Sequence, residues 1–148
     1  MQTILEALME ANEIAEIRAL HYADIREFNS FADSVTGLDV PLNLVIPTPV
    51  QYTLTQPISN GILQLEGFIL TRLKEDTNDW RSPALEAEYI APMRQLGVNF
   101  LMALMQTTIA DLSKPAPTAT FNREIMFLPH HFFGVSYRCS IPIKAKAC

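Results

Sequence analysis

Two small groups of side chains in this sequence have residue types that can do chemistry. The first is the adjacent pair His130 and His131, which precedes Cys139 and offers atoms that bind Zn²⁺. Neighbouring residues of an extended chain point to opposite sides, so both imidazoles cannot reach one ion. No other Asp, Glu, Cys or His lies at the spacing of a structural zinc site. We therefore expect no metal.

The second group is Glu75, Asp76 and Asp79, which could supply a carboxylate pair for general acid–base catalysis. These residues are interleaved with asparagine and threonine, which is the ordinary composition of a solvated loop. The sequence has no G-x-G-x-x-G, G-x-x-x-x-G-K-[ST], G-x-S-x-G or H-E-x-x-H motif. We predict no catalytic residues, no cofactor and no enzymatic activity.

Composition limits the class of protein. The 148 residues are 49% hydrophobic and 18% charged, and we expect residues 1–148 to form a single domain. The net charge of −5 and the scattered basic residues argue against a surface that holds nucleic-acid phosphates. The glutamate-rich start is not typical of a secretion signal, and no apolar run is long enough to span a bilayer. We expect no membrane association.

The elements that must position these side chains begin with an amphipathic helix over Thr3–Arg18. Its apolar residues recur every three or four positions and predict one buried stripe. Four glutamates form the opposite face and are expected to be solvated: Glu6, Glu10, Glu13 and Glu16. The aromatic-rich segment that follows predicts a short strand over Ile25–Phe31.

The middle of the sequence predicts strands. Leu42–Ile46 is β-branched and flanked by prolines, which favours an edge-like strand. The dipeptide Asn60-Gly61 predicts a hairpin between Val50–Thr55 and Ile62–Leu73. In the second of these strands, Phe68 and Leu70 lie on the face opposite to the other apolar residues, so we expect a second buried contact there.

The last third predicts a helix and a terminal hairpin. The helix is expected to begin at Ser82-Pro83 and to kink or restart at Pro92. Thr118–Ile143 predicts two strands that turn at Pro129-His130-His131, and the second alternates apolar and polar residues. The fold class is therefore α+β, with a mainly antiparallel sheet of four or five strands packed against two α-helices. The helix residues Phe100, Leu101 and Leu104 should pack on Val135 and Tyr137.

This order of elements resembles the small α+β fold of tailed-bacteriophage tail-terminator and neck or tail ring proteins, most closely in phages of Bacteroidetes hosts. The resemblance covers about Pro41–Ile143. It is carried by the following segments: Leu42–Pro49, Ile62–Leu73 leading to Asp79-Trp80, MRQLGVNFLMAL, and FNREIMFLPHHFFGVSYRCSIPI. It implies a non-enzymatic structural virion protein that forms a ring, often of six or twelve copies, around the DNA channel.

Such a ring subunit is made in the host cytoplasm and functions in the virion neck or tail, next to portal, connector or tail proteins. DNA passes through without specific binding, which an acidic protein without a basic stripe suits. The residues expected at the interface between copies are Phe68, Leu70, Phe132 and Phe133. One alternative is a ligand- or peptide-binding module that presents the aromatic residues of Tyr22–Phe31. Another is a small hydrolase that uses the histidine pair.

Overall fold

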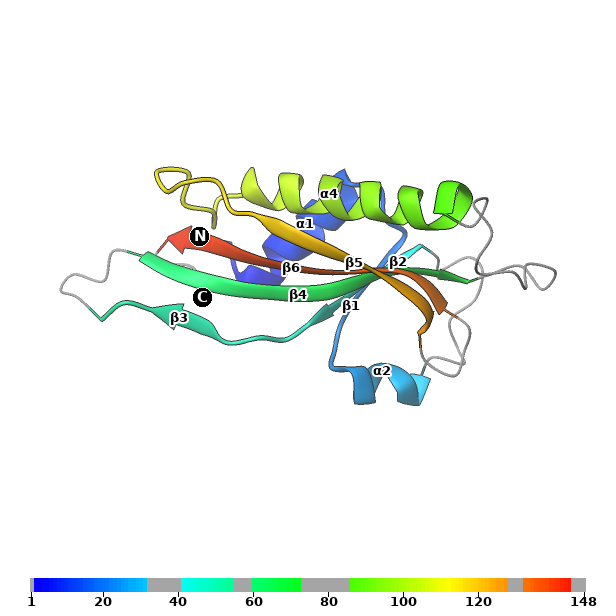
Figure 1. Cartoon of the computed structure of the whole chain (residues 1–148). Helices are drawn as coiled ribbons and strands as arrows, with labels where there is room; N and C mark the ends of the chain where they lie inside the picture. Colours follow the sequence, from blue (N-terminus) through cyan, green and yellow to red (C-terminus); the bar gives the residue numbers. More distant parts are fainter. Residues whose placement is uncertain (1, 32–40, 55–59, 73–85, 128–131, 145–148) are drawn as a thin grey trace.

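The computed structural model describes residues 2–31, 41–54, 60–72, 86–127 and 132–144. They form an α+β structure in which helices lie on both faces of a mixed sheet, so the predicted α+β class is confirmed, with three α-helices in the described residues instead of two (Figure 1). The sheet has six strands in the described residues instead of four or five. These are β1 (Ala19–Tyr22), β2 (Leu42–Ile46), β3 (Val50–Tyr52), β4 (Asn60–Arg72), β5 (Ala119–Phe127) and β6 (Phe132–Lys144).

The strands are hydrogen-bonded in the order β1-β2-β4-β6-β5. The long strands β4 and β6 pair antiparallel along their whole length, and β5 pairs antiparallel with β6, which confirms the terminal hairpin. β3 pairs antiparallel with β4, so the predicted strand pairing is confirmed. The predicted turn at Asn60-Gly61 is wrong, because both residues belong to β4, where Asn60 pairs with Lys144 and Gly61 with Tyr52. β2 has the predicted bounds but lies between β4 and the parallel strand β1, so the prediction of an edge strand is wrong.

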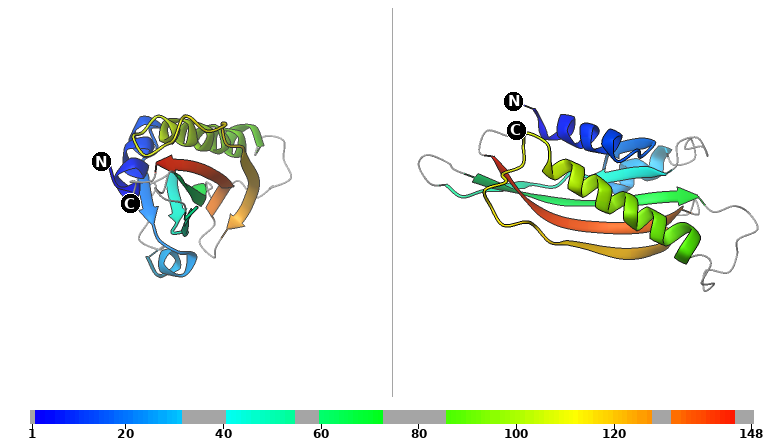
Figure 2. Two further views of the ribbon diagram at one scale, coloured as in Figure 1. Left: turned by 90° about the vertical axis from the view of Figure 1, so that its left-hand side faces the viewer. Right: turned by 90° about the horizontal axis from the view of Figure 1, so that it is seen from above.

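Two helices cover one face of the sheet side by side (Figure 2). These are α1 (Ile4–Ile14) and α4 (Ala91–Met105). The Thr3 side chain caps α1 by accepting from the Glu6 N–H, and the four predicted glutamates are exposed. A π-helical turn, η2 (Glu86–Ile90), leads into α4. Pro92 lies in the first turn of α4, where it costs no hydrogen bond, so the helix restarts there. The predicted start at Ser82-Pro83 lies outside the described residues.

A third helix, α2 (Ile25–Phe31), lies on the opposite face at one end of the sheet (Figure 1). This segment was predicted to be a strand, and that prediction is wrong. The side chain of Asp24 accepts a hydrogen bond of 2.7 Å from the Glu27 N–H, which is the geometry of a helix cap. The aromatic spacing that suggested an extended chain includes a helical residue that faces the sheet, since Phe28 is completely buried.

The main core lies between the sheet and the pair α1 and α4. The predicted packing is confirmed, because Phe100, Leu101 and Leu104 of α4 share one buried cluster with Val135 and Tyr137 of β6. The ring centroids of Phe100 and Tyr137 are 6.0 Å apart. The inward residues of β6 follow the predicted alternation from Phe133 to Ile143, and each is buried. Burial of this apolar area is the main driving force for folding.

A chain of polar side chains crosses this core. The Tyr137 hydroxyl donates a hydrogen bond of 2.8 Å to the Asn43 side-chain oxygen. The Asn43 amide donates to the Asn12 side-chain oxygen at 3.2 Å, and the Asn12 amide donates to the Ile17 carbonyl at 3.1 Å. These three hydrogen bonds thus join β6, β2 and the end of α1. Gly67 makes room for it, because a Cβ there would lie 2.4 Å from the Tyr137 hydroxyl.

A second, smaller core lies between α2 and the opposite face of the sheet. It contains Ala23, Phe28, Leu42, Leu44, Phe68, Leu70 and Phe132. Phe68 is 7% exposed, and Leu70 and Phe132 are fully buried. The second contact predicted for Phe68 and Leu70 therefore exists, but the same chain supplies it. Phe133, on the other face of β6, is 1% exposed. The assignment of these four residues to an interface between copies is corrected, because none is more than 7% exposed.

We predict that Tyr137→Phe destabilises the protein by about 1–3 kcal/mol, because it removes the donor that Asn43 requires in a buried position. Denaturant titration measures the change. The control is Ser140→Ala, which removes an exposed hydrogen bond to Gln64 and should change the free energy of unfolding by less than about 0.5 kcal/mol. Equal, small effects of the two substitutions would contradict the role of the buried polar chain.

Phe68→Glu should prevent folding, because it places an unpaired carboxylate in the second core. The loss should exceed the roughly 3–5 kcal/mol typical of Phe→Ala in a core. Circular dichroism and urea titration measure it. Ile62→Glu is the matched control, since Ile62 lies on the same face of β4 but is 40% exposed. A folded Phe68→Glu variant that merely changes oligomeric state would show that Phe68 belongs to an interface after all.

Candidate functional site

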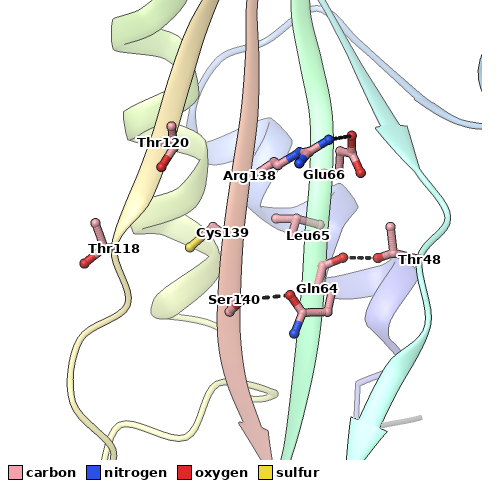
Figure 3. A pocket seen from close by; sticks show the side chains of 9 residues that line it. All are labelled: Thr48, Gln64, Leu65, Glu66, Thr118, Thr120, Arg138, Cys139 and Ser140. Atoms are coloured by element: carbon pink, nitrogen blue, oxygen red, sulfur yellow. Dashed lines mark hydrogen bonds and ion pairs between the residues drawn. The ribbon is translucent and has the colours of Figure 1, made fainter.

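The face of the sheet opposite to α1 and α4 is open and polar beyond α2. Two rows of side chains from neighbouring strands face each other there, because Gln64 pairs with Ser140 and Glu66 with Arg138 in the register of β4 and β6. Figure 3 shows these side chains beside Thr48 and Thr120. They line a shallow hollow of about 420 Å³. A second hollow, of about 530 Å³, continues along the face toward Asn122 and Ser136.

The side chains of this polar face bind one another. Arg138 Nη2 lies 3.1 Å from Glu66 Oε1, and the Ser140 hydroxyl donates to Gln64 Oε1 at 2.8 Å. The Thr48 hydroxyl donates to the Gln64 backbone carbonyl. The guanidinium and the carboxylate neutralise each other at the surface, and most of the remaining polar groups are hydroxyls and amides, together with the Glu124 carboxylate. This arrangement favours hydration and weak polar contacts, and it contains no activated nucleophile.

The thiol of Cys139 is also unreactive. Cys139 is a free, buried cysteine, and burial raises the pKa of its thiol. A thiol with a raised pKa is a poor nucleophile and a poor metal ligand at neutral pH. In the part of the chain that the structure describes, no group of three or more His, Cys, Asp or Glu side chains could hold a metal ion. His130, His131, Glu75, Asp76 and Asp79 lie outside the described residues.

An apolar groove of about 380 Å³ lies between α4 and β5, and we call it the α4–β5 groove. Leu101, Phe121 and Ile141 form part of its lining, and Cys139 contributes to it. Met102 and Leu112 also line it, and each is 65% exposed. The sequence favours a core position for Met93, Met102 and Met105 over a binding groove; Met93 is buried, but Met102 is not. The signal was available, because Met102 lies off the stripe traced by Phe100, Leu101 and Leu104.

A second partly apolar hollow, also of about 380 Å³, lies at the opposite edge of the molecule between α1 and β1. Leu5, Met9, Leu20 and Tyr22 line it with Asn12, Glu13, Ile17 and Arg18, and we call this region the α1–β1 surface. Leu5 is 41% and Met9 is 56% exposed. Of the aromatic residues of Tyr22–Phe31 that the alternative ligand-binding module would present, Tyr22 is exposed and Phe28 is buried, and the alternative stays a prediction.

The three surfaces differ in chemistry and in position. The polar hollows lie on the open sheet face, whereas the two apolar regions flank opposite edges of the sheet, at β1 and at β5 (Figure 2). Among the described helices, none has the length and apolar character needed to cross a membrane. Neither a protein-family model nor a curated protein matches this sequence.

Proposed function

We propose that this protein is a non-enzymatic structural subunit that assembles into a ring in the neck or tail of a tailed bacteriophage, around the DNA channel. The observation that carries the proposal is that the domain has two unlike sheet edges, each flanked by exposed apolar side chains. A monomeric domain usually protects its strand edges and scatters its exposed apolar residues singly.

In the described part of the sheet, the outermost strands are β1 and β5, and each has a single neighbouring strand; β3 also has a single neighbour, β4, beside β2. Tyr22 of β1 is 42% exposed and adjoins Met9 of α1 in the α1–β1 surface. Near β5, the α4–β5 groove exposes Met102 and Leu112. The edges thus share apolar character but differ in shape, since one is a short parallel strand beside a helix and the other is a long antiparallel strand beside a groove.

Unlike edges favour head-to-tail association. When one surface of a subunit binds a different surface of the next, the assembly either closes on a rotation axis or grows as a filament. Closure gives a ring, and a ring is the form that a conduit for DNA requires. The resemblance to tail-terminator and ring proteins supports this outcome, with six or twelve copies and with portal, connector or tail proteins as neighbours. Because Phe68 is buried, it cannot form the contact between copies, and the two outermost strands carry the proposal instead.

The open polar face is compatible with a channel. Its charged pair, Arg138 and Glu66, is internally neutralised, and the net charge of the chain is −5. Such a surface offers little attraction for phosphates, so DNA would move past it without being held. Passage of DNA along this face would need no specific contact between DNA and protein.

We predict that the purified protein forms a closed assembly of defined copy number as its concentration rises. Native mass spectrometry and light scattering should find one discrete mass that is a multiple of 16.6 kDa, and electron microscopy should show rings. A protein that is monomeric at every concentration, or that stops at a two-fold dimer, would contradict the proposal. Antibody labelling of virions tests the location separately: rings that are absent from the neck and tail would refute the phage role alone.

A further inference from the structure

We infer that β3 of one copy pairs antiparallel with the outer side of β5 of the next copy, so that the sheet continues from copy to copy. This inference rests on the proposed self-assembly and names the two strands that would meet. Their pairing places the strands in the order β3-β4-β6-β5, so in the described part of the sheet β3 and β5 each have one open side (Figure 1). β3 and β5 run in opposite directions within one copy, and a copy that continues the sheet therefore brings them together antiparallel.

The hydrogen bonds of β6 show which residues of β5 direct their backbone groups to the open side. On the side of β6 away from β4, the Lys144 N–H donates to the Ile109 carbonyl at 2.9 Å. The backbone groups of successive residues alternate between the two sides of a strand, so Arg138 directs its groups to this side as well. Thr120 lies opposite Arg138 and is bonded to it. Phe121, the next residue, therefore directs its N–H and C=O to the open side.

The same reasoning applies to β3. The Thr48 hydroxyl donates to the backbone carbonyl of Gln64, which therefore points away from β6. Ile62 of β4 has the same orientation and lies opposite Gln51, so Gln51 is the residue of β3 that is bonded to β4. Val50 directs its N–H and C=O to the open side. It can exchange both backbone hydrogen bonds with the outward residue of β5.

The side chains fit this register. The residues that lie opposite each other are Val50 and Phe121, Tyr52 and Ala119, and Leu54 and Pro117. The three partners from the second copy all line the α4–β5 groove. Val50 packs against the main core, so the alternation of an extended chain places Tyr52 on the same face as the groove. Leu54 is 85% exposed, and the small Ala119 leaves room beside it for the Tyr52 ring. The added strand would cover the groove with apolar side chains.

Charge favours β3 over β1 as the strand that fills this position. The described lining of the groove contains no charged side chain, and Thr48–Leu54 contains none either. The hollow beside β1 is lined by Glu13 and Arg18, and burying such groups against an apolar groove is costly. On the opposite face, Gln51 would continue the polar row that includes Thr120.

A disulfide between copies tests the register. Gln51 and Thr120 are exposed and lie opposite each other in it, as a pair that shares no backbone hydrogen bond. Such pairs bring their Cβ atoms close enough for a disulfide. Within one copy, β4 and β6 separate the two positions by about 14 Å or more, so the bond can form only between copies. The variant carries Gln51→Cys and Thr120→Cys, with Cys148→Ser to remove a competing thiol.

Mild oxidation of this variant should give a ladder of covalent oligomers on a non-reducing gel, which ends at the copy number found by native mass spectrometry. The control combines Gln51→Cys with Asn122→Cys, which moves one thiol two residues along the same face of β5, and it should give no ladder. Rings without a ladder in the Thr120 variant would overturn this inference and leave the proposed ring intact. Equal ladders in the two variants would also overturn the inference.

A second substitution tests the apolar contact. Leu54→Glu should raise the protein concentration at which rings form by about tenfold or more, because it places a carboxylate in the groove of the next copy. Ile14→Glu is the matched control, since Ile14 is 59% exposed and lies on α1, outside both strands, and it should keep the parental assembly. Equal effects of the two substitutions would contradict the contact. A parental protein that is monomeric at every concentration would refute both proposals.

Discussion

The structure depends on one buried polar connection, in which Tyr137 is joined through Asn43 to Asn12. Three groups that water would otherwise solvate are brought into an apolar core, and they are stable there because each finds a partner. The connection also specifies the arrangement. A shift of β2 by one residue would turn Asn43 to the opposite face, so the Tyr137 hydroxyl and the Asn12 side-chain oxygen would lose their partner. The apolar residues supply most of the stability, and these hydrogen bonds select the register in which the strands pack.

Much of the fold could be predicted from periodicity. The alternation in β6 correctly indicated a strand with one buried face, and the apolar, proline-flanked composition of Leu42–Ile46 correctly indicated another. The α2 segment could not be predicted this way, since seven residues give only two helical turns, too few to repeat a helical pattern. Phe68 and Leu70 show a different limit. Their pattern correctly required a second apolar cover, but a sequence pattern does not say whether the cover comes from the same chain or from another.

The candidate site was harder to predict than the fold. Its two apolar regions arise from the order of the strands, which places β1 and β5 at the edges, and strand order depends on contacts between distant segments. The four residues of β1 carry no clear alternation, so the edge that they form was not anticipated. The candidate metal ligands and catalytic carboxylates lie outside the described residues: His130, His131 and the carboxylates near Asp79. Their expected lack of metal and catalysis stays a prediction.

The hydrogen bond from Asn12 to the Ile17 carbonyl has a consequence for the geometry of any assembly. It fixes where the chain leaves α1, and therefore the angle at which this helix lies against the sheet. In a closed ring, a small rotation at each subunit is multiplied by the number of copies, so an error of a few degrees would open the circle into a spiral. Asn12, which is buried, would then affect whether a ring closes as well as how stable each subunit is.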